Sequence, residues 1–213
     1  MRTRAPSIGA FAVATGAMAA VVVASNILVQ FPVDASLGTV SLADVLTGGA
    51  FTYPLAFLVT DVVNRTFGPA LARRVALAGF AVAVVMSVLL ASPRIAVASG
   101  TAFLAAQLFD VALFDRLRSG PWWRAPLASS VAASALDTTL FFTLAFAAAI
   151  PWAVDPFATK VTALFGIVPL EAPRWIGWAL ADFAVKLAIA ALALGPYRVL
   201  AARLLDAPAL RRV

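Results

Sequence analysis

Long apolar stretches separated by short polar segments run through most of this chain. A membrane-spanning helix needs about 20 mostly apolar residues. The pattern predicts six helices, over about residues 8–30, 51–64, 74–90, 95–114, 127–150 and 175–194. The first stretch is longer than the ~7–15-residue core of a signal peptide, so we interpret it as a retained span. Because no linker divides the chain, we expect residues 1–213 to form a single integral membrane domain.

Proline and glycine mark the boundaries of the predicted helices. Pro54 lies near the start of the second helix, where proline is tolerated. Gly68 and Pro69 follow its end, and Gly195 and Pro196 are expected to end the sixth helix. Residues 32–48 and the proline-containing segment 151–174 are expected to be loops between helices.

Basic residues are distributed unevenly between the two sides that six spans would create. If the N-terminus is cytoplasmic, the cytoplasmic segments hold Arg2, Arg4, Arg65, Arg73, Arg74, Arg116, Arg118, Arg124, Arg198, Arg203, Arg211 and Arg212. The opposite side holds Arg94, Lys160 and Arg174. Cytoplasmic loops of membrane proteins carry an excess of Lys and Arg, so this asymmetry supports six spans with both termini in the cytoplasm.

Composition agrees with a membrane protein and excludes several kinds of chemistry. The chain is 63% hydrophobic and 12% charged, whereas a soluble domain carries about 25% charged residues. It has no Cys and no His, so thiol catalysis, disulfides and the commonest transition-metal ligands are absent. No Walker motif or nucleophile elbow is present, so we expect neither enzyme activity nor a cofactor. We interpret the net charge of +6 as membrane topology rather than nucleic-acid binding.

Polar side chains inside two predicted spans call for a partner or a function, because they are costly in a bilayer. Asp61 and Asn64 share a face of the second helix. They indicate either a ligand or proton site, or a polar helix end with a salt bridge to Arg65. Gln107 and Asp110 repeat this spacing on the fourth helix. They indicate recognition of a heterocycle edge, or an interhelical hydrogen bond.

Two further predicted helices carry polar faces. Ser134 and Asp137 belong to a stripe on the fifth helix, in which the serine alone would suit close helix packing. Phe141 follows one turn later, where its ring would stack on a planar ligand or pack in the core. Asp182 and Lys186 have the i,i+4 order that favours an ion pair, which either only neutralises charge or faces a water-filled cavity.

Asn26, near the end of the first predicted helix, and Arg94, in the short turn before the fourth, are further candidates for the same pocket. All of these side chains converge only if the helices form a bundle. The substrate-binding candidates are Asn26, Asp61, Asn64, Arg94, Gln107, Asp110, Ser134, Asp137, Phe141, Asp182 and Lys186.

Five short motifs occur in an order that is typical of one family. They are SNILV at 25–29, YPLAFLVTDVVNRTFG at 53–68, RIAVAS at 94–99, QLFDV at 107–111 and SALDT at 134–138, with Trp122 and Trp123 before the last. Through them the chain, from about residue 20 to 200, resembles the queuosine precursor transporter family, also called the vitamin uptake transporter family.

This resemblance implies uptake of a 7-deazapurine across the bacterial inner membrane, either 7-cyano-7-deazaguanine or 7-aminomethyl-7-deazaguanine. It implies an all-α bundle of six transmembrane helices, similar to the substrate-binding subunit of energy-coupling-factor transporters. The implied partners are the substrate and the lipid bilayer. The oligomeric state stays open, with a homodimer as one candidate.

Three functions remain open at this point. The chain is a solitary carrier, a binding subunit for a heterocycle or vitamin that needs a separate ATPase module, or a membrane scaffold or integral enzyme whose buried charges only hold helices together. The energy source is also open.

Overall fold

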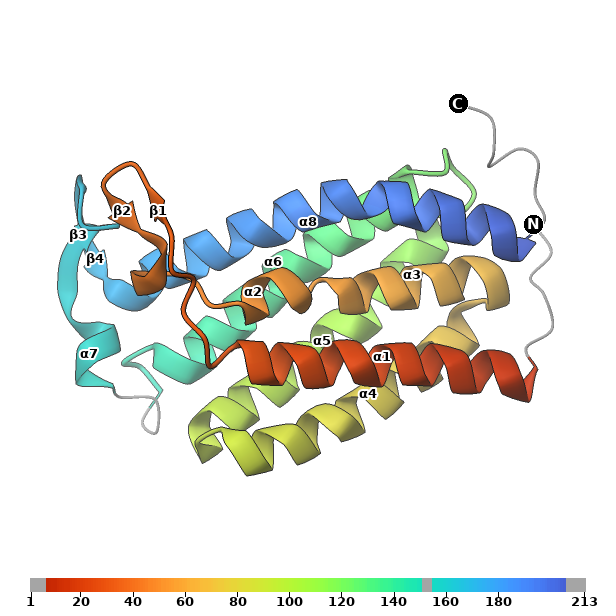
Figure 1. Cartoon of the computed structure of the whole chain (residues 1–213), viewed down its shortest axis with the longest axis horizontal. Helices are drawn as coiled ribbons and strands as arrows, with labels where there is room; N and C mark the ends of the chain where they lie inside the picture. Colours follow the sequence, from red (N-terminus) through yellow and green to blue (C-terminus); the bar gives the residue numbers. More distant parts are fainter. Residues whose placement is uncertain (1–6, 151–154, 206–213) are drawn as a thin grey trace.

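The computed structural model describes residues 7–150 and 155–205. Figure 1 shows long helices lying side by side, with two small hairpins at one end of the bundle. The helices are α1 Ile8–Leu28, α2 Gly49–Thr52, α3 Leu55–Phe67, α4 Pro69–Leu90, α5 Pro93–Leu117, α6 Arg124–Phe146, α7 Pro156–Thr159 and α8 Arg174–Leu205. A short 3-10 helix covers Leu42–Asp44. The strands are β1 Ser36–Leu37, β2 Val40–Ser41, β3 Val161–Leu164 and β4 Val168–Pro173.

Local sequence signals explain where several helices begin. The side chain of Ser7 accepts a hydrogen bond from the backbone of Ala10 and caps α1. Ser92 caps α5 in the same way, and the following proline occupies the first helical position. Between α3 and α4, Gly68 has a φ of 92°, which residues with a Cβ atom rarely adopt. The break after α3 thus lies at Gly68, as the sequence predicts, and Pro69 begins α4, ahead of the predicted start at about residue 74.

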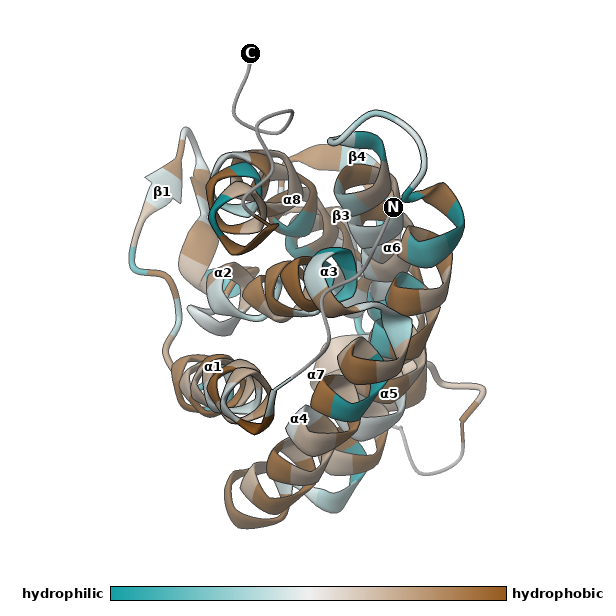
Figure 2. Cartoon of the chain, turned by 90° about the vertical axis from the view of Figure 1, so that its right-hand side faces the viewer, coloured by the Kyte–Doolittle hydropathy of each residue, from teal (hydrophilic) through white to brown (hydrophobic). Residues whose placement is uncertain are grey.

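Helix α3 lies at the centre of the bundle. It contacts α1, α4, α5, α6 and α8, and the view along the helices shows the others arranged around it (Figure 2). Asp61, Asn64 and Arg65 on α3 are all buried. The central position of this short helix explains why so many polar residues of the second predicted span are removed from lipid.

Five helices of the described part of the chain are long and apolar enough to cross a membrane: α1, α4, α5, α6 and α8. The protein is therefore a mostly helical, multi-pass membrane protein. The remaining predicted span, residues 51–64, is divided between α2 and α3, with Tyr53 and Pro54 between them. Proline has no backbone N–H to donate to the preceding turn, and this accounts for the break between the two helices.

The prediction that Gly195 and Pro196 end the last helix is wrong, because α8 continues through Pro196 to Leu205. A membrane helix tolerates a proline where neighbouring helices support the following turn. Here Tyr197 is 1% exposed, its hydroxyl accepts a hydrogen bond of 2.7 Å from Arg65, and its ring packs edge-on against Phe114. These contacts hold the turn that follows the proline.

The segments predicted to be loops contain two antiparallel hairpins, β1–β2 and β3–β4. In the second hairpin, Phe165 and Gly166 both have positive φ values, as tight hairpin turns require. Such strands are too short for an alternating pattern to be distinguished from a loop. We call this end of the bundle the hairpin end.

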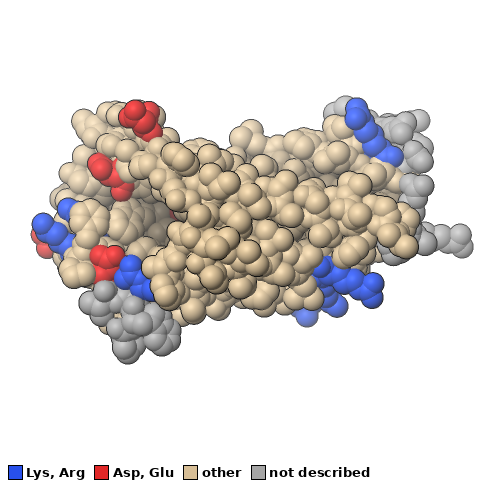
Figure 3. All heavy atoms as spheres, turned by 60° about the horizontal axis from the view of Figure 1, so that its bottom comes forward, with Lys and Arg blue, Asp and Glu red and all other residues tan. Residues whose placement is uncertain are grey.

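The opposite end, the basic end, carries most of the positive charge. It comprises the start of α4 and α6 and the end of α3, α5 and α8, where Arg73, Arg74, Arg116, Arg124 and Arg203 lie. On the face seen in Figure 3, a broad uncharged surface separates blue side chains at this end from mixed charges at the other. Arg2, Arg4, Arg211 and Arg212, which also entered the predicted asymmetry, lie outside the described residues.

Candidate functional site

A cavity of about 390 Å³ lies within the bundle, toward its hairpin end. Its lining extends from exposed residues of the loop after α1, among them Gln30 and Asp44, to the buried Lys186. The volume is in the range of small-molecule sites, about 300–1,000 Å³. The cavity is therefore large enough for a small ligand, and its lining connects the hairpin end to the interior.

Three charged side chains form an ion cluster at the inner part of this cavity: Asp137, Asp182 and Lys186. The Nζ atom of Lys186 lies 2.7 Å from Oδ2 of Asp137 and 2.5 Å from Oδ2 of Asp182. The hydroxyl of Tyr53 donates to Oδ1 of Asp137 at 2.8 Å, and that of Thr138 donates to Asp182 at 2.8 Å. With all three groups ionised, the cluster carries one net negative charge.

The fold explains how these residues meet. Asp182 and Lys186 are one turn apart on α8, so the ion pair predicted from their spacing is present. Asp137 faces them from α6, which packs against α8. Tyr53 lies at the break between α2 and α3, and its ring is 5.4 Å from the Lys186 ammonium. The interrupted helix therefore brings an aromatic hydroxyl to the charged group.

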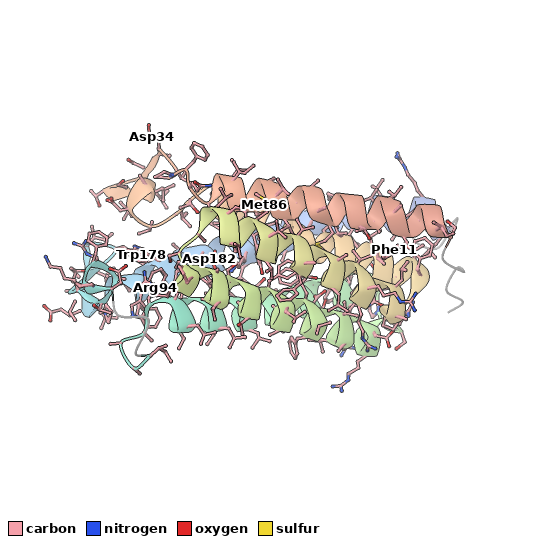
Figure 4. The ribbon with its side chains drawn as sticks, turned by 90° about the horizontal axis from the view of Figure 1, so that it is seen from below. Phe11, Asp34, Met86, Arg94, Trp178 and Asp182 are labelled. Atoms are coloured by element: carbon pink, nitrogen blue, oxygen red, sulfur yellow. The ribbon has the colours of Figure 1, made fainter. Side chains whose placement is uncertain are left out.

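Aromatic side chains form the wall of the cavity on the side of α6 and α8. Phe141, Phe142, Phe146 and Trp178 line it, and the Phe146 and Trp178 rings meet edge-on with centroids 5.4 Å apart. Trp178 lies one turn before Asp182 on α8, nearer the hairpin end (Figure 4). Flat apolar surfaces thus adjoin the charged floor of the cavity.

Arg94 closes part of the hairpin end rather than lining the cavity. Its guanidinium donates to Oδ2 of Asp155 at 3.1 Å and lies 5.4 Å from the centroid of Phe146. Hydrogen bonding to Arg94 lowers the pKa of the Asp155 carboxyl. The pair joins the start of α5 to the segment before α7, which is next to the cavity's aromatic wall.

A second polar cluster lies deeper in the bundle, between α3, α5 and α6. Its central feature is a pair of neighbouring carboxyl groups, Asp61 and Asp110, which are 2% and 0% exposed. Thr60 Oγ1 lies 3.0 Å from Gln107 Oε1 and 3.4 Å from Asp110 Oδ2. Ser130 donates to Asp61 at 3.2 Å. These contacts show two acidic side chains held mainly by hydroxyl groups.

The predicted site residues therefore fall into separate places. Five line the large cavity: Asn26, Asp137, Phe141, Asp182 and Lys186. Four belong to the deeper region around the carboxyl pair: Asp61, Asn64, Gln107 and Asp110. Asn64 donates to the backbone carbonyl of Val111 at 2.9 Å, and Ser134 lies between the two regions.

Sequence reasoning did not single out Tyr53 or Trp178 as site residues. Tyr53 precedes Pro54 in one of the motifs that carry the family resemblance, so its position beside a helix break was available as a signal. Trp178 lies close to the start of a predicted span, where an interfacial position is the usual explanation. Only the approach of α6 to α8 brings it to the cavity.

The geometry defines a class of protein: a multi-pass membrane protein with a ligand-sized cavity whose floor is charged and whose wall is aromatic. The family model described as "Putative vitamin uptake transporter" matches residues 47–92 and 87–200. The chain belongs to this vitamin uptake transporter family.

Two curated relatives carry more specific names. The "Queuosine precursor transporter" of Escherichia coli (strain K12) is 37% identical, over 59% of this chain and 64% of that protein. The chain thus spans less than two thirds of the length of that relative. The "Probable queuosine precursor transporter" of Haemophilus influenzae is 33% identical, over 74% of this chain and 77% of that protein. Both are named as transporters rather than enzymes. No solved structure matches the chain significantly.

Proposed function

We propose that this protein is a bacterial inner-membrane carrier that takes up 7-cyano-7-deazaguanine or its aminomethyl counterpart, and binds the base in the large cavity. The observation that carries the proposal is the ion cluster beside an aromatic wall in a cavity of about 390 Å³. The names of the two relatives support the same substrate class.

The cavity's polar groups complement the edge of a deazaguanine. Its amidine edge carries several N–H donors, for which the carboxylates of Asp137 and Asp182 are acceptors. Its carbonyl accepts hydrogen bonds, and the Lys186 ammonium would be the matching donor on exchanging one of its three contacts, to Asp137, Asp182 and Thr138, for the base. A wrong base would leave some of these buried groups unpaired, which is how a polar site discriminates strongly.

The aromatic wall complements the flat faces of the base. Phe141 and Trp178 line the cavity beside the ion cluster, and the Phe141 ring meets Phe142 edge-on with centroids 5.0 Å apart. Stacking against a planar heterocycle adds favourable burial without a further charged contact. A base held by its edge at the ion cluster would present its faces to this wall.

The proposal includes the arrangement of the chain in the membrane. We count α2 and α3 together as a sixth, interrupted membrane segment, which would resemble the substrate-binding subunits of energy-coupling-factor transporters. The basic end then faces the cytoplasm by the positive-inside rule. The large cavity, at the hairpin end, faces outward and is positioned to receive substrate.

Proteoliposomes that contain only this chain test the proposed function. We expect labelled 7-cyano-7-deazaguanine to enter vesicles, and Asp137→Asn to reduce the rate at least tenfold. Asp34→Asn is the matched control, because Asp34 is exposed near the hairpin end, outside the cavity lining (Figure 4).

The same experiment also distinguishes a solitary carrier from a binding subunit. Binding without uptake would show instead a subunit that needs an ATPase module. If the base neither binds nor enters while the protein is folded, the proposed function is wrong.

A further inference from the structure

A small cavity connects the ion cluster to the deeper carboxyl pair. It measures about 10 Å³, and the residues of its lining that carry polar side-chain groups are Asp61, Ser130, Ser134, Lys186 and Tyr197. A buried water needs roughly 10–15 Å³ and two to four polar partners. The small cavity thus has room for about one water between the two charged sites.

Ser134 supports a ligand at this position independently. It is 1% exposed, and its Oγ has no hydrogen-bond partner among the described residues. Buried hydroxyls are normally hydrogen-bonded. On α6, Ser134 lies one turn after Ser130, which donates to Asp61, and one turn before Asp137. A water in the small cavity would satisfy Ser134 and would complete a chain of polar groups between the two sites.

The carboxyl pair and the ion cluster differ in what balances their charge. In the ion cluster, an ammonium contacts both carboxylates. The pair is held by the hydroxyls of Thr60, Ser129 and Ser130. Two adjacent carboxylates in a buried site do not readily ionise together, and the stable arrangement shares one proton between them.

Charged and titratable groups approach the pair from several helices. Within the pair, Asp61 is on α3 and Asp110 is on α5, and Lys186 and Tyr197 come from α8 across the small cavity. Arg65 is on α3 itself, where it donates to the Tyr197 hydroxyl at 2.7 Å and to the backbone carbonyl of Arg118 at 2.7 Å. Lys186 and Arg65 thus each have close partners outside the pair.

We propose that the carboxyl pair Asp61–Asp110 is the proton-coupling site of uptake, joined to the substrate cavity by a water beside Ser134. This inference rests on the proposed function. In each cycle one proton enters from the hairpin end, binds a carboxylate oxygen of the pair, and leaves toward the basic end. Only O–H bonds form and break. A neutral base carried with one proton brings one positive charge inward.

Gradient-driven uptake and counterflow in the same proteoliposomes separate coupling from binding. With one proton per base, each pH unit of gradient supports up to about tenfold accumulation. We expect accumulation by the unsubstituted chain, an increase with a negative-inside membrane potential, and lumen acidification when base is added. For Asp61→Asn and Asp110→Asn we expect counterflow to persist and the accumulation ratio to fall to about one.

Ser134→Ala tests the connecting water. We expect gradient-driven uptake to slow about tenfold while counterflow stays within twofold. Thr66→Val is the matched control, because it also removes a buried hydroxyl, in this case on α3 and lining neither cavity, and it should change neither rate.

Each remaining result contradicts a stated claim. Counterflow that proceeds while accumulation ignores both the pH gradient and the membrane potential overturns the coupling inference alone. Loss of counterflow in both Asp variants also overturns it, because the pair would then serve binding. If the unsubstituted chain shows no counterflow, the proposed function fails and the coupling inference fails with it.

Discussion

Replacement of Lys186 by methionine tests whether the ion cluster is held by its single ammonium. The ammonium lies 2.7 Å from Asp137 and 2.5 Å from Asp182, and its side chain is only 4% exposed. Breaking a buried pair by removing one partner costs about 3–5 kcal/mol, since the remaining charge is left uncompensated. Here two carboxylates lose the same partner, so we expect the upper part of that range.

The expected effect is large enough for a melting experiment in detergent. For a chain of this size, 1 kcal/mol shifts the Tm by about 2–4 °C. Lys186→Met should therefore lower the Tm by roughly 10 °C. Lys160→Met is the control, because Lys160 is exposed at the hairpin end and its loss should cost less than about 0.5 kcal/mol.

A triple variant distinguishes lost charge balance from lost packing. Lys186→Met combined with Asp137→Asn and Asp182→Asn removes the cation and both anions while keeping similar shapes. We expect it to recover most of the lost stability, since neutralising a whole buried cluster is far less costly than breaking it. A triple variant as unstable as Lys186→Met, or a Lys186→Met protein that melts within about 2 °C of the parent, would refute the reasoning.

Three further changes have predictable effects on stability. Tyr53→Phe removes a hydrogen bond to the ion cluster and should cost about 1.5–3 kcal/mol, measured as a lower Tm; an unchanged Tm would argue against that bond. Gly68→Ala should cost about 1–3 kcal/mol because of the positive φ, whereas Gly195→Ala, in a helix with open space around it, should not destabilise. The pKa of the Asp155 carboxyl is lowered in the folded protein, so its pairing with Arg94 stabilises the folded state at pH values above about 3.9, the ordinary pKa of an aspartate. This contribution disappears as the pH falls through the lowered pKa. Arg94→Gln should therefore lower the free energy of unfolding by about 0.2–1 kcal/mol at pH 7, seen as a slightly lower Tm, and by less in strong acid, where the ion pair no longer contributes; an effect that grows in acid would contradict this.

The long apolar runs contain enough information to locate five of the six predicted spans in the described part of the chain, because lipid imposes both length and composition. The ion pair between Asp182 and Lys186 was predictable for a similar reason, since helical spacing alone places the two on one face. The prediction about Pro196 failed because the contacts of Tyr197 with α3 and α5 are between distant parts of the chain.

The division of the polar residues into two sites could not be predicted from spacing. Asp61 and Asp137 look alike in sequence, as lone carboxylates within apolar helices. Asp61 lies on the central helix and faces serines of α6, whereas Asp137 faces Lys186 of α8 at the cavity. The surroundings of Asp61 and Asp137 differ because α3 occupies the centre of the bundle. That position depends on packing among all the helices.

A structure determined with 7-cyano-7-deazaguanine bound would test the central claim most directly. We predict density for the base in the large cavity, with its amidine edge at Asp137 and Asp182 and a face against Phe141 or Trp178. Density for the base outside this cavity, at the lipid-facing surface or at the carboxyl pair Asp61–Asp110, would contradict the claim that the ion cluster forms the substrate site.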